Sequence, residues 1–285
     1  MKKTILLLTI TTHLLASLSD TVHSSVSTFY ESKDFSNSLQ KKDGQIYGIG
    51  IDLHRKGSTY KITYESGNNN TKKPSLQTDL KTEKLFLRYG YRLNDNFEVH
   101  INYVNILNDN IAITDGGVAY GFGITSNINK KLSTDITQFY TNYDDFDVYQ
   151  SDLRVDYKMK FNDFKIKLSS ITKYIKIDEK SVNGFTKNAD ENYLTTALRL
   201  HTHYNSYHLG ISGYLGKRAF AIMNDGTKIQ HHAMEFDRTY AIGIGKVIDS
   251  YVFRFQYIYQ RATELPKLNQ NVDVKVFRLV GNYKF

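Results

Sequence analysis

The stretch VFRLVGNYKF, residues 276 to 285, alternates apolar and polar side chains and ends on an aromatic residue. One parity carries the large apolar side chains, namely Phe277, Leu279, Tyr283 and Phe285. The other carries the polar side chains Arg278, Asn282 and Lys284. A period of two residues indicates a β-strand with one apolar and one polar face. Chain ends usually fray, so we expect this patterned strand to be held by pairing with another strand.

The same alternation runs through long stretches elsewhere in the chain. Three clear examples are NFEVHINYV at 96–104, SDLRVDYKMKF at 151–161 and SYVFRFQYIYQR at 250–261. Strands in globular proteins usually have about five or six residues, whereas a tilted strand that crosses a membrane needs about 9 to 11. The length of these runs therefore favours a barrel in lipid.

The segments between the strands are of two kinds. Short turns occur at 54–59, 93–97, 127–131, 161–164, 204–207 and 248–251. Longer polar stretches occur at 67–81, 108–115, 176–189, 217–232 and 263–272. Tyr and Phe residues lie beside both kinds of segment. Short turns at one end, long loops at the other and two aromatic bands are typical of an outer-membrane barrel. A soluble sandwich with a Tyr-rich core is the alternative, but it does not explain one-sided long loops.

The composition agrees with a chain of paired strands. There are 22 Tyr and 16 Phe but only 2 Pro, and Pro is excluded from paired strands because it lacks an N–H. The absence of Cys excludes disulfides and thiolate metal sites. The net charge is +8, yet the basic residues are spread along alternating strands. We therefore expect no nucleic-acid partner, which would need a clustered basic face.

The first residues have the features of an export signal. Lys2 and Lys3 precede an apolar run over residues 5–16, and small residues follow, with cleavage expected near Ser19 or Ser24. The run is too short for a membrane-spanning helix, which needs about 20 apolar residues. We expect a cleaved signal peptide over residues 1–24.

The closing stretch 276–285 resembles the C-terminal assembly signal of bacterial outer-membrane β-barrel proteins, in which aromatics alternate and the strand ends in Phe. Residues 25–285 resemble the small monomeric porins of that class. The resemblance implies an all-β protein, a transmembrane antiparallel up-and-down β-barrel in the bacterial outer membrane. It also implies outer-membrane lipid and the outer-membrane assembly machinery as partners, and a monomer.

We expect fourteen strands, with twelve as the alternative. Thirteen runs are visible, and an even number requires the weaker segment 25–32 as the first strand. The expected strands are 25–32, 44–54, 57–66, 82–92, 96–107, 116–126, 131–142, 148–160, 163–175, 190–203, 206–216, 233–247, 250–262 and 273–285.

Function is expected to reside in the polar, inward parity of these strands. The candidate pore-lining residues are Lys84, Arg88, Arg92, Glu98, Arg154, Asp156, Lys158, Arg199, Arg254 and Arg278. Basic residues outnumber acidic ones on this face, so we expect a passive, weakly anion-preferring pore for small hydrophilic solutes or ions.

Two further features of the inward face bear on whether the lumen is open. Inward glycines such as Gly121, Gly123 and Gly210 either leave room or accommodate neighbouring aromatics. Inward Phe86 and Phe139 predict partial filling. The alternative function is a structural or surface-interaction barrel with a filled lumen, whose long loops bind a partner. The stretches 67–81 and 217–232 are long enough to bind a partner or to fold inward as a constriction.

No enzyme is expected. No nucleotide motif and no outer-membrane hydrolase pattern is present, so we expect no catalytic residues and no cofactor. His201 and His203 lie two residues apart on one strand face, and His208 follows a tight turn. Two imidazoles at a spacing of two residues could bind a metal. A polar lumen lining is the favoured interpretation, and His231 and His232 in a long loop are a weak metal signal.

Overall fold

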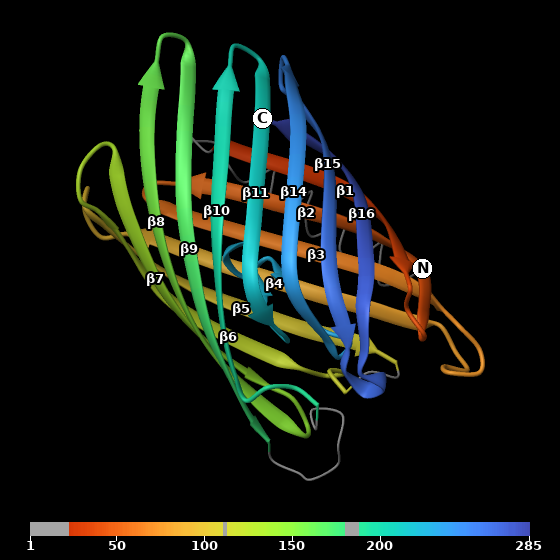
Figure 1. Ribbon diagram of the computed structural model, residues 1–285. Helices are drawn as coiled ribbons and strands as arrows, with labels where there is room; N and C mark the ends of the chain where they lie inside the picture. Colours follow the sequence, from red (N-terminus) through yellow and green to blue (C-terminus); the bar gives the residue numbers. More distant parts are fainter. Residues whose placement is uncertain (1–22, 111–112, 180–187) are drawn as a thin grey trace, which may run out of the picture.

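The computed structural model describes residues 23–110, 113–179 and 188–285, and this part of the chain is almost entirely β. Fourteen antiparallel strands close into one barrel in which sequence neighbours pair (Figure 1). The predicted fold class and the preferred strand number are therefore confirmed. The expected signal peptide lies outside the described residues, except for His23 and Ser24, which begin the first strand.

Each expected strand is present, and most extend further than predicted. The barrel strands are β1 (His23–Ser36), β2 (Lys41–Arg55), β3 (Ser58–Thr71), β4 (Leu80–Arg92), β5 (Phe97–Asp109), β6 (Val118–Asn127), β7 (Leu132–Asn142), β8 (Phe146–Phe161), β9 (Phe164–Glu179), β10 (Asn192–Tyr204), β11 (Tyr207–Arg218), β14 (Met234–Ile248), β15 (Tyr251–Glu264) and β16 (Asn269–Lys284). A short η2 helix (Leu265–Lys267) joins the last two. The extra length lies mainly on the long-loop side, where residues expected in loops continue the strand pairing.

The barrel closes between its first and last strands. β1 pairs with β16 from Ser25 opposite Lys284 to Ser36 opposite Asp273. The amide of Ser24 donates to the carbonyl of Phe285 at 3.2 Å, and the amide of Phe285 donates back at 3.0 Å. Closure satisfies the backbone groups of both strands, as a structure in hydrocarbon requires. The patterned last strand is thus held by pairing, as predicted.

The outer face of the barrel is apolar. Large side chains such as Ile101, Phe122 and Leu198 are more than half exposed. Aromatic pairs bridge adjacent strands near both ends, with ring centroids 4.5 Å apart for Phe164 and Tyr204 at the short turns and 5.3 Å for Tyr140 and Tyr149 toward the long loops. This arrangement suits a surface in contact with lipid and its headgroups.

Within the described ranges, no helix has the length and apolar character needed to cross a membrane.

The short turns form where the sequence predicts them. Asn162, Asn205 and Asp249 have φ values of 52°, 51° and 51°, a backbone conformation that Asn and Asp tolerate better than other residues with a side chain. The tight turns therefore set the register of the hairpins β8–β9, β10–β11 and β14–β15.

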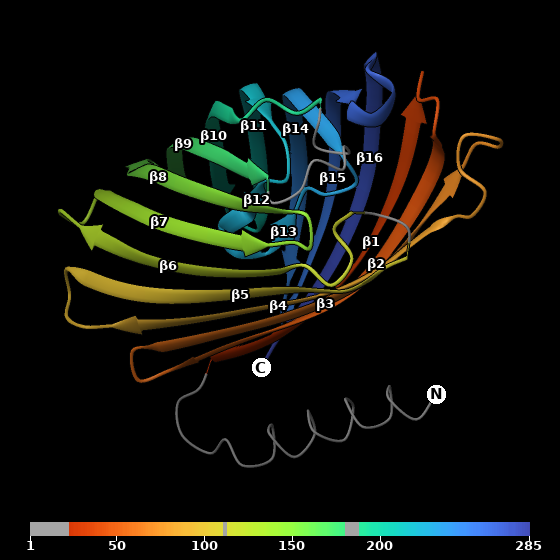
Figure 2. The same ribbon diagram turned by 90° about the horizontal axis from the view of Figure 1, so that it is seen from below.

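One long segment turns into the barrel. Between β11 and β14, residues 219–233 form the two-residue strands β12 (Ile222–Met223) and β13 (Lys228–Ile229), joined by the η1 turn (Asn224–Gly226). Figure 2 shows this pair inside the ring of barrel strands. The η1 turn reaches β4 and β5, on the far wall from the strands that carry it. We call residues 219–233 the inward loop.

Candidate functional site

The inward loop packs on one wall of the barrel, formed by strands β4 to β10, which we call the filled side. Phe220 is 1% exposed, and its ring lies 4.8 Å from that of Phe146 and 6.2 Å from that of Tyr143, measured between centroids. The same apolar cluster contains Phe86 and Phe139. These buried rings occupy part of the lumen, so the predicted partial filling is confirmed.

Polar side chains of the filled side bind the backbone of the loop. The side-chain amide of Gln150 accepts from the amide of Ile222 and donates to its carbonyl, both at 2.8 Å. Lys173 donates to the same carbonyl at 3.0 Å and forms an ion pair with Asp152. Gln150 and Lys173 are buried, and a buried polar group is costly when it lacks a partner. These bonds therefore fix the loop at one height in the barrel.

The tip of the loop is held by arginines. The carboxylate of Asp225 lies 2.5 Å from Nη1 of Arg154, and its backbone carbonyl accepts from Arg88 at 3.0 Å. Arg199 donates to the side chain of Asn224 at 3.1 Å. Desolvation raises the pKa of Asp225, but nearby guanidinium groups, above all that of Arg154, outweigh it and hold this pKa well below its usual range.

The other candidate residues have different surroundings. Asp156 lies between Arg154 at 3.4 Å and Lys167 at 2.9 Å. Arg92 and Glu98 face each other across β4 and β5 beside a short turn. Lys158 is exposed near the same end of the barrel.

Glu31 joins the loop to the opposite wall. This carboxylate is 1% exposed and lies 3.0 Å from Nζ of Lys228 in the loop and 3.4 Å from Nη1 of Arg278 in β16. The guanidinium of Arg278 also stacks over the ring of Phe29, 4.4 Å from its centroid. Two cations therefore share one buried carboxylate, and part of their charge remains for the lumen.

One ion pair and two hydrogen bonds close the end of the loop, and we call the four residues that form them the latch: Glu65, Lys84, His231 and Asp109. Lys84 lies 2.5 Å from Glu65 and 3.0 Å from Nε2 of His231, whose Nδ1 lies 2.8 Å from Asp109. An ammonium group can only donate, so Nε2 accepts and Nδ1 carries the proton. The geometry therefore requires a neutral His231.

Electrostatics agree with this assignment. Burial lowers the pKa of His231 well below its ordinary value of 6.5, and the ammonium of Lys84 lowers it further. Burial also lowers the pKa of the adjacent His232, and His231 adds to that shift. Both imidazoles are neutral at neutral pH.

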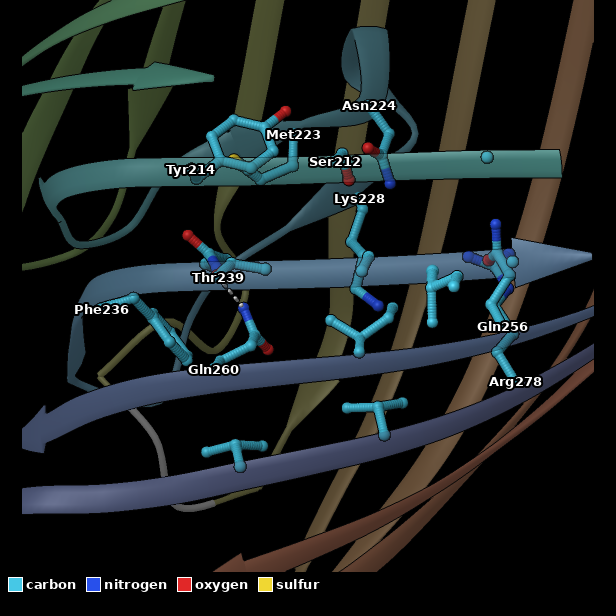
Figure 3. A pocket seen from close by; sticks show the side chains of 18 of the residues that line it. Ser212, Tyr214, Met223, Asn224, Lys228, Phe236, Thr239, Gln256, Gln260 and Arg278 are labelled. Atoms are coloured by element: carbon cyan, nitrogen blue, oxygen red, sulfur yellow. Dashed lines mark hydrogen bonds between the residues drawn. The ribbon is translucent and has the colours of Figure 1, made fainter. Parts of the chain in front are cut away.

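A cavity of about 430 Å³ borders the inward loop, and its lining comes mainly from β11, β14, β15 and β16, with further residues from β1 to β4, β9 and β10. Nine basic residues line it: Lys33, Lys41, Lys84, Lys167, Arg199, Arg218, Lys228, Arg254 and Arg278. Among the described residues of its lining there is no Asp or Glu. Figure 3 shows Lys228 reaching from the loop toward the wall that carries Gln256 and Arg278. We call the wall formed by β11, β14, β15 and β16 the open side.

Arg254 is the most accessible of the predicted cations on the open side. Its side chain is exposed, and no carboxylate within the described ranges forms an ion pair with it. Arg88 and Arg154 were predicted from the same parity rule, but their guanidinium groups bind the inward loop. The structure thus separates residues that the sequence grouped together.

The inward glycines differ between the two sides. A Cβ at Gly121 would lie 2.4 Å from the ring of Phe139, and one at Gly123 would lie 2.3 Å from His100. At Gly210 on the open side, the nearest atom to such a Cβ, in His201, is 3.8 Å away. Gly121 and Gly123 accommodate neighbouring rings and Gly210 leaves space, so both proposed roles occur.

Several interior residues were not among the predicted pore-lining residues. They are Glu31, Asp109, Gln150, Asp225 and His231. Asp225 and His231 lie in a loop, where strand parity gives no direction, and Asp109 is at the very end of its strand. Gln150 was on the correct parity but carries no charge to mark it.

No protein-family model matches the chain, and no curated protein matches it either. Solved structures do resemble it. A bacterial polysaccharide outer membrane secretin has a TM-score of 0.55 at 8% identity, over 94% of this chain and 100% of that one. The Ralstonia pickettii toluene transporter TbuX has a TM-score of 0.54 at 10% identity, over 94% of this chain and 90% of that one. The CymD monoaromatic hydrocarbon channel has a TM-score of 0.53 at 9% identity, over 95% and 89%.

The fold is therefore that of bacterial outer-membrane β-barrels, the class predicted from the closing strand and the turns. At identities of about 10%, the likeness to these structures shows a shared fold and does not indicate a shared solute.

Proposed function

We propose that the protein is a passive, weakly anion-preferring pore for small hydrophilic solutes in the bacterial outer membrane. The observation that carries this proposal is the cavity, whose described lining has nine Lys or Arg residues and no Asp or Glu. In a confined space with low-dielectric walls, an excess of one charge raises the local concentration of the opposite ion. Anions are favoured on the open side.

The preference for anions is weak because several of these basic side chains form ion pairs with carboxylates outside the cavity lining. Lys84 contacts Glu65, and Lys228 and Arg278 share Glu31. Arg254 contributes a whole charge to the lumen. The expected selectivity is therefore a bias toward anions and not the exclusion of cations.

The lining also argues for hydrophilic solutes. TbuX and CymD are a toluene transporter and a monoaromatic hydrocarbon channel. Here the cavity places guanidinium, ammonium and amide groups beside its apolar parts (Figure 3). A hydrocarbon would have to displace water from these groups without replacing its hydrogen bonds, at a cost in free energy.

The proposed setting follows from the asymmetry of the barrel. The short turns face the periplasm and the long loops face outward, as in other outer-membrane barrels. The protein is exported with its signal peptide cleaved, is inserted by the assembly machinery, and works as a monomer in outer-membrane lipid.

Planar-bilayer recording tests this function. Refolded protein is placed in a salt gradient, and single-channel conductance and reversal potential are measured. Steady conductance with a reversal potential biased toward anions supports the proposal. A barrel that is folded by heat-modifiable gel mobility and yet carries no current contradicts it.

A barrel with a filled lumen is the second candidate, because the inward loop packs tightly on β4 to β10. In that case the projecting β3–β4 hairpin around residues 72–79 binds a partner (Figure 1). Deleting residues 73–78 then abolishes partner binding, whereas a pore keeps its conductance after the same deletion.

A further inference from the structure

Three histidines meet at the short-turn end of the β10–β11 hairpin. His203 and His208 are direct cross-strand neighbours, and His201 lies opposite Gly210. The ring centroids are 4.0 Å apart for His203 and His208, 4.6 Å for His201 and His203, and 6.0 Å for His201 and His208. One ring nitrogen from each lies within 4.8 Å of the others.

The backbone explains why the three rings converge. Residues 201 and 203 share a strand face, since side chains alternate along a strand. The short turn brings His208 onto the same face of the neighbouring strand. Gly210 has no side chain, so the ring of His201 leans across it, with Cδ2 of that ring 3.8 Å from where a Cβ would be.

The ring nitrogens of these histidines have no competing partners. In the part of the chain that the structure describes, none of the three rings makes a hydrogen bond or an ion pair, and Nδ1 of His208 is buried without a partner. His231 differs, because Asp109 and Lys84 occupy both of its ring nitrogens. The trio therefore offers lone pairs that the latch does not.

We propose that His201, His203 and His208 form a binding site for a divalent transition-metal ion such as Zn²⁺, Ni²⁺ or Cu²⁺. Imidazole is a preferred ligand of these ions, and three histidines with a further position for water or an anion are a known zinc arrangement. Zn–N bonds of about 2.0 to 2.1 Å place tetrahedral ligand atoms about 3.4 Å apart, which small side-chain rotations reach from the observed spacing. With no carboxylate ligand, the site does not suit Ca²⁺ or Mg²⁺.

The positive charge around the three histidines favours metal ions that bind imidazole strongly. Lys167 and Arg254 line the same cavity as His201 and His208, so the electrostatic field does not attract a cation. The ion has to be held by coordination bonds, which favours Cu²⁺, Ni²⁺ and Zn²⁺ over more weakly bound ions. A bound ion adds positive charge at one mouth of the cavity, and its effect on current rests on the proposed pore.

Calorimetric titration of the folded barrel in detergent with Ni²⁺ and Zn²⁺ tests the site directly. We expect saturable binding of close to one ion per chain. His201→Ala, His203→Ala and His208→Ala should each weaken it by roughly tenfold or more, because each removes one ligand. His54→Ala is the matched control, since His54 is exposed near the same end of the barrel and bonds Thr59. Gel mobility without metal shows that each variant is folded.

Spectroscopy adds a readout that a structural role would not change. The electron paramagnetic resonance spectrum of bound Cu²⁺ should show coupling to several imidazole nitrogens, and fewer in each variant. Retained binding in His208→Ala overturns the proposal, as does binding that is lost only in His232→Ala. The absence of saturable binding to the unaltered barrel also overturns it.

Conductance separates this proposal from the proposed function. If metal binds but no current flows, the site stands and the pore is contradicted. If current flows and no metal binds, the pore stands and the site is contradicted.

Discussion

The filled side and the open side of this barrel are built from the same alternating strands, yet their inward side chains have different roles. On the filled side, Phe86 and Phe139 pack against the inward loop while Arg88 and Arg154 bind its tip. On the open side, Gly210 leaves space and Arg254 extends into a cavity lined by cations. Parity along a strand decides which side chains point inward. The groups that face an inward charged side chain across the lumen decide whether it binds the inward loop or attracts a solute.

Removing the inward loop should have the largest effect on this comparison. Replacing residues 220–231 with a short Gly-Ser turn deletes the packing of Phe220 and the anchor at Asp225. We expect conductance to rise several-fold, because the filled side becomes part of the channel. Single-channel recording measures this change.

The matched control shortens the β3–β4 hairpin at residues 73–78, which projects from the barrel (Figure 1). That deletion should leave the conductance unchanged. An unaltered conductance after loss of the inward loop would show that the loop does not restrict the lumen.

Loosening the loop should have a smaller effect than deleting it. Gln150→Leu removes both hydrogen bonds between this side chain and the backbone of Ile222. The buried backbone amide of Ile222 is then left without a partner. Such a loss costs about 1–3 kcal/mol, so the docked state loses roughly 5- to 150-fold in population relative to the undocked state. Limited proteolysis within residues 219–233 should become faster, and the current should fluctuate more.

Gln138→Leu is the control for this loosening. Gln138 lies on the neighbouring strand β7 but is exposed on the outer face, where it accepts from Ser151. Equal protease sensitivity in the two variants would contradict the assigned role of Gln150.

Charge reversal distinguishes the two sides by selectivity. Arg254→Glu places a carboxylate on the open side, so we expect the reversal potential to move toward cation preference with little change in channel noise. Arg88→Glu should instead disturb the loop tip, since Arg88 donates to the carbonyl of Asp225. If Arg88→Glu shifts selectivity more than Arg254→Glu, the assignment of the conducting side is wrong.

The latch predicts a modest dependence on pH. In the docked loop the pKa of His231 is lowered well below 6.5, whereas an undocked histidine keeps a value of about 6.5. The undocked loop therefore binds more protons as pH falls below about 6.5, and the docked state loses stability there. We expect conductance to rise between about pH 7 and about pH 5.5.

His231→Gln cannot take up this proton, so its conductance should vary less over the same interval. His54→Gln provides the control, because His54 is exposed at the short-turn end of β2 and bonds Thr59. An identical pH response in all three proteins would remove His231 from the explanation.

The strands and turns could be predicted because their signals are local. The alternation from Phe277 to Phe285 depends only on which residues face lipid, and the turns at Asn162 and Asn205 depend on backbone conformations that Asn tolerates. Closure followed from the need to pair every backbone group in hydrocarbon.

The interior could be predicted only in part, because its contacts are distant in sequence. His231 meets Asp109 across 122 residues, and Ile222 meets Gln150 across 72. No periodicity connects such positions. Parity also gave Arg88 and Arg254 the same expected role, since it carries no information on the carboxylate or loop that faces each side chain.

The most direct test of the two-sided lumen uses the absence of cysteine from the chain. Ser212→Cys puts one thiol on the lining of the cavity, and Thr137→Cys puts one on the filled side, where the native side chain is 4% exposed. A thiol reagent that carries a sulfonate is added while current is recorded. We expect rapid modification and a drop in current at position 212, with no modification at position 137. Equal rates at the two positions, or faster reaction at 137, would contradict the division of the lumen into a filled side and an open side.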